Sequence, residues 1–312
     1  MARGGDVPAV SLALVSLIGI LSHTYGCTAN DLADIESDRL NASRKASVLV
    51  TGAISPRSAR TALVVQLAAA QGLAVFAVVI LEARWYFVAG TAALFISVTV
   101  SNVFQKRRIA HPLAMDTLFG LNMGVPALLC CALLPTVDLT PALLVGAAFA
   151  IHMVLLNVVA GNLKDLEHDR AVGDDTTALR LRVRLTDDRL VLSTPVHRRL
   201  VALLVAGSLG SLLALTLLAP VPLPQRVALS AAVCLLHLLT ARSVRTLLTG
   251  HRPVSPNGRE ASLGLNFLSL MLASSPWAPV PVLVVAVVTA AWLPLTRPLV
   301  TTPSHLIRSE RP

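Results

Sequence analysis

The sequence predicts an all-α membrane protein, a polytopic bundle of about nine transmembrane helices that forms one domain over residues 1–312. Hydrophobic residues make up 54% of the chain and charged residues 14%, whereas a soluble domain has about 25% charged residues. The apolar residues gather in runs of about 20, the length that a helix needs to cross a bilayer. The basic residues are concentrated in every second connection between these runs. The net charge of +9 therefore indicates membrane topology rather than nucleic-acid binding.

Nine apolar segments are expected to be helices, because continuous apolar runs of this length can satisfy their backbone polar groups in lipid only as helices. They span residues 8–29, 59–81, 85–104, 112–134, 141–161, 199–219, 224–248, 261–275 and 278–296. Prolines mark the turns after the sixth and eighth segments, at Pro220, Pro222, Pro224, Pro276 and Pro279. The eighth segment is short and contains Asn266.

The distribution of Lys and Arg predicts which side of the membrane each loop faces. If the first segment runs from outside to inside, the inside loops carry 23 of the 26 basic residues, and only Arg3, Arg84 and Arg226 fall outside. This bias places the basic loops in the cytoplasm, and we expect the protein in a bacterial cell membrane. Four segments separate residues 31–40 from residues 162–171, so both stretches are expected on the cytoplasmic side.

One acidic stretch occurs twice in the chain. Residues 31–40 read DLADIESDRL and residues 162–171 read NLKDLEHDRA. Without gaps, Asp34 aligns with Asp165 and Asp38 aligns with Asp169. Eleven of the 17 acidic residues lie in or directly after these two stretches. Chance rarely repeats so specific a pattern at two equivalent helix ends, so we interpret the pair as a functional repeat rather than as two solvated acidic surfaces.

The spacing of the carboxylates predicts a metal site. Asp31, Asp34 and Asp38 would share one face of a helix, as would Asp165 and Asp169. Carboxylates stacked in this way repel each other unless a cation neutralises them, and the membrane boundary increases that cost. Carboxylate and amide oxygens suit magnesium that is shared with phosphate oxygens. No His or Cys accompanies them at the spacing of a zinc site.

Basic residues near the two stretches could hold an anion. They are Arg39, Arg44, Lys45, Lys106, Arg107, Lys164 and Arg170. Ordinary loop charge explains most of them, but Lys106 is the first charge after a long apolar segment. A magnesium site beside cations suits a diphosphate, and the apolar bundle beneath it suits the hydrocarbon tail of that diphosphate.

These motifs resemble those of the UbiA superfamily of intramembrane prenyltransferases. The resemblance rests on the first motif from Asn30 to Asp38, followed by Asn41 and by GAIS at residues 52–55. It rests also on the second motif from Asn162 to Asp169, followed by Gly173 and Thr176. Gln105-Lys106-Arg107 is similar to the family's Leu-Lys-Arg element. The order and spacing agree over half of the chain, and the resemblance implies a UbiA-like fold.

The resemblance also implies a cofactor, a donor and a set of site residues. The cofactor would be Mg²⁺, and the donor an isoprenyl diphosphate that ionises to an allylic cation. The metal ligands would be Asn30, Asp34, Asp38, Asn162, Asp165 and Asp169. The catalytic residues would be Asp31, Asp38 and Lys106, and the diphosphate would contact Lys106, with Arg44, Lys45 and Lys164 nearby. Members usually have one more span before the first motif, so that span is expected to be missing or to lie upstream of residue 1.

The acceptor is expected to be small and aromatic, and it needs polar groups beside the reacting carbon. Such groups are predicted to line one cavity next to Asp34 and Asp165, and the candidates are Asn102, Asn122, Asp116 and Tyr25. An ion pair with the basic cluster at 106–108 is the other interpretation of Asp116. Helix–helix hydrogen bonding is the other interpretation of the asparagines, including Asn157 and Asn266. The aromatic candidates for stabilising a cation are Phe104, Phe119 and Phe267.

Two alternatives to prenyl transfer remain open at this stage. A membrane terpene cyclase would ionise the same donor but let an internal alkene attack, without an acceptor. Many family members carry an Arg-Pro pair where this chain has Ser47-Val48, and only 4% of its residues are aromatic, so the cyclase stays open. A transporter would use the paired acidic stretches as a cation site, but transporter sites usually lie near the membrane midplane.

Overall fold

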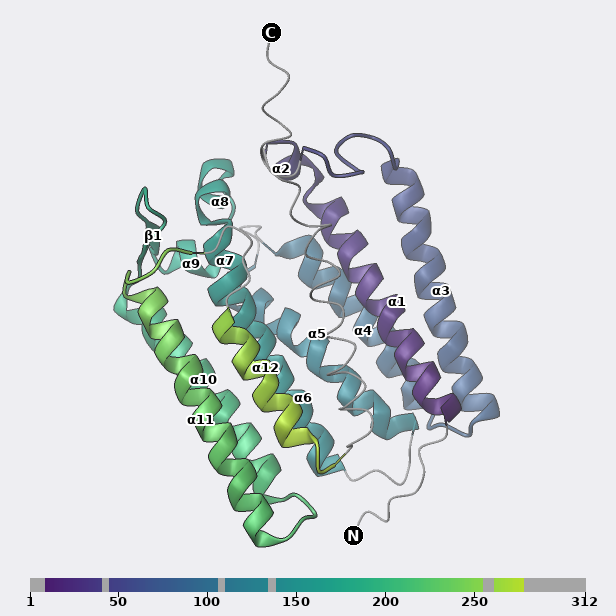
Figure 1. Cartoon of the computed structure of the whole chain (residues 1–312). Coiled ribbons are helices and arrows are strands. Elements are labelled where there is room, and N and C mark those ends of the chain that lie inside the picture. Colours follow the sequence, from purple (N-terminus) through teal and green to yellow (C-terminus); the bar gives the residue numbers. More distant parts are fainter. Residues whose placement is uncertain (1–8, 41–44, 106–109, 134–138, 255–260, 278–312) are drawn as a thin grey trace.

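The computed structural model describes residues 9–40, 45–105, 110–133, 139–254 and 261–277. Its long helices lie side by side in one bundle (Figure 1). Five described helices are long and apolar enough to cross a membrane: α3 (Pro56–Ile80), α4 (Tyr86–Phe104), α6 (Leu139–Leu156) with its continuation to Lys164, α10 (Pro195–Leu217) and α11 (Leu223–Leu248). The helices α1 (Ala9–Ala33), α5 (Pro112–Leu133) and α12 (Ala261–Ser274) pack with them.

Eight of the nine expected segments correspond to these helices, and the segment at 278–296 lies outside the described residues. Two helices begin earlier than the apolar pattern indicates. α3 begins at Pro56 because Ser55 caps it, its hydroxyl accepting from Ser58 N at 3.0 Å. α10 begins at Pro195 because Thr194 caps it in the same way. A Ser or Thr cap followed by proline is a strong start signal, and it extends both helices into polar sequence.

The bundle is polar in several buried places and apolar on its outside. Large apolar side chains such as Val79, Leu203 and Leu238 are 67%, 71% and 68% exposed. By contrast, Ser208, His237 and Asn266 are almost fully buried and hydrogen-bonded to one another across α10, α11 and α12. A soluble protein rarely exposes so much apolar surface, whereas a bundle in lipid hides its polar groups between helices.

Helices α5 and α6 approach each other more closely than side chains would permit. A Cβ at Gly124 would collide with the carbonyl oxygen of Gly146, and a Cβ at Gly120 would collide with that of Ala150. Small residues at such a contact let two helix backbones approach closely within a membrane. This contact joins the first half of the bundle to the second half.

Short elements gather at the end of the bundle where α1 and α6 finish (Figure 1). They are α2 (Ile35–Leu40), the π-helix η1 (Asn157–Gly161), α7 (Asn162–Lys164), α8 (Leu166–Val172) and α9 (Thr177–Arg180). Two short antiparallel strands follow, β1 (Arg184–Leu185) and β2 (Val191–Leu192), with Arg184 opposite Leu192. α8 ends at Gly173, whose φ of 78° is the left-handed conformation that glycine adopts easily. Both acidic stretches lie in this region.

Candidate active site

The two acidic stretches have the same local geometry. Asp34 separates α1 from α2, and Asp165 separates α7 from α8 at the aligned position. Asp38 N donates to Asp34 O at 2.7 Å, and Asp169 N donates to Asp165 O at 2.8 Å. Both helices are interrupted at the first aligned aspartate, although each of these bonds keeps the i to i−4 pattern of an α-helix across the interruption.

A cavity of about 710 Å³ opens beneath both breaks. The predicted ligands that line it are Asn30, Asp34, Asn162, Asp165 and Asp169, together with Asp31. Asp38, which was expected to bind metal and to assist catalysis, is half-buried and does not line the cavity. It lies one turn beyond the break at Asp34, on α2. The two motifs, distant in sequence, thus present their carboxylates to one shared space.

The basic candidates are placed differently from one another. Lys164 lines the cavity, and its Nζ lies 3.6 Å from Asp165 Oδ2. Lys45 is exposed and does not line the cavity, while Arg44 and Lys106 lie outside the described residues. Arg39 forms an exposed ion pair with Glu36. Lys164 is therefore the cation that the described part of the chain brings to the cavity.

Arg170 and Arg180, also near the second motif, have structural partners. The Arg170 guanidinium donates to Val183 O at 3.0 Å, which ties α8 to the start of the β-hairpin. Arg180 forms an ion pair with Asp175, which itself lines the cavity. The hydrogen bond and the charge of Asp175 raise the pKa of the Arg180 guanidinium above its ordinary value. These two arginines therefore hold the loop after the second motif.

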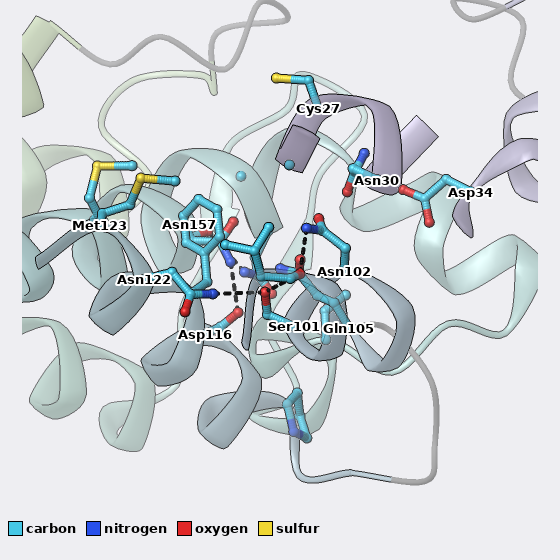
Figure 2. Close-up of a pocket in the computed structure, with 18 of the residues that line it drawn as sticks. Cys27, Asn30, Asp34, Ser101, Asn102, Gln105, Asp116, Asn122, Met123 and Asn157 are labelled. Atoms are coloured by element: carbon cyan, nitrogen blue, oxygen red, sulfur yellow. Dashed lines mark hydrogen bonds between the residues drawn. The ribbon is translucent and has the colours of Figure 1, made fainter. Parts of the chain in front are cut away.

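Deeper in the cavity, one wall consists of amides and a carboxylate (Figure 2). Asn102, Asn122 and Asp116 all line the cavity and are nearly fully buried. Asn122 Nδ2 donates to Ser101 Oγ at 3.0 Å, and Ser97 Oγ donates to Asn122 Oδ1. Asn102 Nδ2 donates to Val98 O at 2.8 Å. These hydrogen bonds fix the amides in place beside the acidic end of the cavity.

Tyr25 was expected at this wall, but it does not line the cavity. Its hydroxyl lies 2.6 Å from Thr99 Oγ1, and its ring packs edge-on against Phe95 with 4.9 Å between centroids. It is a buried residue of the α1–α4 contact, because it lies on the opposite side of α1 from Cys27 and Asn30. His23 and Cys27, on the same helix, do line the cavity.

Several cavity residues have no signal in the sequence. Met123, Phe149 and Met153 form part of the apolar lining, and each lies inside a continuous apolar run. Phe119 lines the cavity as well, whereas Phe104 and Phe267 do not. Phe267 lies beside His152 instead, with 6.0 Å between ring centroids. Asn157 and Gly161 line the cavity from the π-helix, a local widening that no periodicity in the sequence indicates.

Comparison with known proteins agrees with this geometry. Among solved structures, a UbiA homolog from Aeropyrum pernix K1 superposes with a TM-score of 0.63 at 16% identity, over 87% of this chain and 90% of that one. A homolog from Archaeoglobus fulgidus, solved with DMAPP and Mg²⁺, superposes with a TM-score of 0.59 at 17% identity, over 87% of this chain and 88% of the homolog. The structure of a digeranylgeranylglyceryl phosphate synthase superposes with a TM-score of 0.61 at 12% identity, over 87% of this chain and 85% of the synthase.

These identities are low, so the superpositions establish the fold alone. No curated protein sequence matches the chain significantly. The sequence model described as the UbiA prenyltransferase family, however, matches residues 1–254, which include both acidic motifs and the helices between them. The chain belongs to the UbiA prenyltransferase family, and it is a prenyltransferase of the membrane-embedded kind.

Proposed function

We propose that this chain transfers an isoprenyl group from an isoprenyl diphosphate to a small aromatic acceptor within the membrane, with Mg²⁺ as the cofactor. The observation that carries the proposal is one cavity with two unlike ends. Carboxylates from both motifs and Lys164 surround the first end. Buried amides and Asp116 form a polar wall further in. The first end suits a diphosphate, and the wall suits an acceptor that carries polar groups.

The donor atoms at the acidic end fit magnesium. Within the described ranges, no three His, Cys, Asp or Glu side chains are grouped closely enough to bind a metal by themselves. Mg²⁺ commonly uses one or two carboxylates and takes its other ligands from phosphate and water. We infer that Asn30 and Asp34 hold one ion, and that Asp165 and Asp169 hold the other, with Asn162 beside them. When bound, Mg²⁺ would neutralise charge on the leaving diphosphate.

The residues of the chain would then do three things in the reaction. Lys164 adds a positive charge beside the diphosphate as the bond between C1 and oxygen breaks and the electron pair leaves with the oxygen. The apolar lining, including Phe119 and Phe149, surrounds the allylic cation and excludes water from it. The amides of the polar wall, Asn102 and Asn122, would hold the acceptor so that a ring carbon attacks C1, and the proton of that carbon would pass to the released diphosphate. The Archaeoglobus homolog with DMAPP and Mg²⁺ supports this donor class and this ion.

The polar wall is the reason to prefer transfer over cyclisation. A cyclase needs a closed, apolar pocket that folds the donor chain over its own cation and excludes water. Here Asn102, Asn122 and Asp116 border the cavity, and their placement costs free energy in a membrane unless they interact with something polar. Part of that cost is met by Ser97, Ser101 and Val98 O. Asp116 accepts from Asn157 and Thr177, and a polar acceptor would use the remaining hydrogen-bonding capacity of Asn102 and Asn122.

The experiment incubates membranes that contain the protein with Mg²⁺ and labelled prenyl diphosphates, with and without a panel of phenolic and quinoid acceptors. Pyrophosphate release and products identified by mass are both measured. We expect products that contain acceptor, and no cyclic hydrocarbon. The Asn122→Leu variant should lose transfer more than ionisation and release prenyl alcohol instead. Leu121→Ala, a change of a lipid-facing neighbour on α5, serves as control. Cyclic hydrocarbon without acceptor would replace this proposal with the cyclase.

A further inference from the structure

Asp116 has a place in the structure that the two acidic motifs do not explain. It lies near the start of α5, is only 3% exposed, and belongs to neither motif. Its Oδ1 accepts from Asn157 Nδ2 at 2.7 Å, a bond drawn in Figure 2. Its Oδ2 accepts from Thr177 Oγ1 at 2.5 Å. One buried carboxylate therefore connects two segments that are 20 residues apart in the chain.

The first of these segments leads directly into the second motif. Asn157 begins the π-helix, and its carbonyl oxygen accepts both the backbone N–H of Asn162 and, at 2.9 Å, the side-chain Nδ2 of Asn162. Gly161 has no side chain, and a Cβ there would collide with Asn157 Oδ1. Asn157 therefore contacts the start of the motif in two ways, through its carbonyl oxygen to Asn162 and through its side-chain oxygen, which lies against Gly161.

The second segment leaves the same motif. Thr177 is the first residue of α9, and Thr176 before it caps that helix and lines the cavity. Ala178 N then donates to Asn162 Oδ1 at 3.5 Å, which brings the two segments together again. Asp116 thus holds the chain just before the second motif and just after it, and the motif between them is anchored at both ends.

We infer that Asp116 is a positioning residue for the second acidic motif, acting through Asn157 and Thr177 rather than on the substrate. The inference rests on the proposed function, since the motif it positions is the one proposed to hold Mg²⁺ and diphosphate. Each oxygen of the buried carboxylate accepts one of these bonds, so a single side chain restrains both segments. Losing either bond would let Asp165 and Asp169 move relative to the first motif.

The test compares variants by the Mg²⁺ concentration that gives half-maximal pyrophosphate release. Thr177→Val keeps the shape of the side chain and removes only the hydroxyl, and we expect it to raise that concentration roughly tenfold. In Asp116→Asn the amide oxygen can still accept from Asn157, and the amide nitrogen can donate to Thr177 Oγ1. This variant should therefore keep most of the pyrophosphate release at a Mg²⁺ concentration close to that of wild type. Asp116→Leu removes both bonds and should lose Mg²⁺-dependent pyrophosphate release. Thr117→Val is the matched control, because Thr117 is exposed and its hydroxyl donates to Leu113 O within its own helix.

A second measurement needs no turnover. In protein without ligand, trypsin should cut after Arg180 and Arg182 faster in Thr177→Val than in wild type or Thr117→Val, because α9 has lost its anchor. If wild type releases no pyrophosphate from any donor, the proposed function fails, and the cleavage rates still test the role of Asp116. Unchanged Mg²⁺ dependence and unchanged cleavage in Thr177→Val would overturn the inference. So would a complete loss of product in Asp116→Asn with normal Thr177→Val, which would make Asp116 a catalytic base.

Discussion

Ser37 Oγ lies 3.0 Å from His168 Nε2, and the two residues occupy the same position of the repeated motif, 131 residues apart. Equivalent residues of a repeat can touch each other only close to the axis that relates the two copies. The acidic motifs therefore meet at this axis, at one end of the bundle. This contact explains why carboxylates from both copies border the same cavity.

The Ser37–His168 hydrogen bond should help to keep the two motifs at the spacing that the diphosphate requires. Ser37→Ala and His168→Ala should each raise the KM for the donor about threefold to tenfold, which corresponds to the loss of one ordinary hydrogen bond. Because both variants remove the same bond, the double variant should be no worse than either one. Steady-state kinetics of the three variants tests this, with Thr51→Val as an exposed control in the loop after the first motif. Additive effects would show that the two residues act separately.

Removing one carboxylate from each motif should stop the reaction without unfolding the protein. Asp34→Ala and Asp165→Ala each remove a proposed metal ligand, so pyrophosphate release should fall below detection. The same changes relieve repulsion between carboxylates when no metal is bound, so the melting temperature without Mg²⁺ should hold or rise slightly. Glu36→Ala is the control, because Glu36 is exposed and pairs only with Arg39 among the ion pairs of the described residues. Near-normal turnover in either aspartate variant would contradict the paired-metal site.

The glycine contact between α5 and α6 should be intolerant of even a methyl group. In Gly124→Ala the new Cβ would meet the carbonyl oxygen of Gly146, so the helices would have to separate. Overpacking of this kind typically costs about 1–3 kcal/mol. Thermal unfolding in detergent measures the loss. Gly72→Ala on α3 is the matched control, since nothing lies within 4 Å of its added Cβ, and it should be neutral or slightly stabilising. Equal stability of the two variants would contradict the close contact.

The orientation in the membrane follows from the basic residues and can be tested directly. A cysteine in place of Ala46, which is exposed in the loop after the first motif, should react with an impermeant thiol reagent only in inside-out vesicles. A cysteine in place of Arg84, in the connection between α3 and α4, should react only in intact cells. Labelling of the parent protein corrects for Cys27, which is exposed in the structure. The reverse pattern would invert the predicted topology.

The helices and the two acidic motifs could be predicted from the sequence, because both depend on local patterns of residues. Apolar runs predict α3 and α10, and the Ser-Pro and Thr-Pro caps start each helix before its apolar run begins. The repeat itself led to the family, and the family assignment sets aside the transporter alternative. The expected count of nine spans stays a prediction, because the segment at 278–296 lies outside the described residues.

Side-chain direction and local breaks could not be predicted in the same way. Tyr25 and Cys27 are two residues apart on α1, and only the packing of Phe95 and Thr99 decides that the tyrosine turns away from the cavity. The interpretation of Asp116 as an ion-pair partner of the cluster at 106–108 gave no hint of Asn157 and Thr177, because those contacts span 41 and 61 residues. The first residue of the π-helix, Asn157, likewise bonds a residue of another helix, Asp116. The direction of the Tyr25 side chain and the partners of Asp116 are set by tertiary contacts, which a short sequence pattern does not predict.

The composition of the far wall of the cavity has a consequence for the substrates that the protein can use. In Figure 2, Met123 lies on the opposite side of the drawn residues from Asn30 and Asp34, and Met153 lines the cavity as well. Thioether side chains are unbranched and polarisable, and they change rotamer at little cost. The part of the cavity next to Met123 and Met153 can therefore change its shape without movement of the backbone. If the donor's tail lies against these two side chains, the range of tail lengths that the cavity accepts would change on substituting Met123 or Met153 without any change to the acidic motifs.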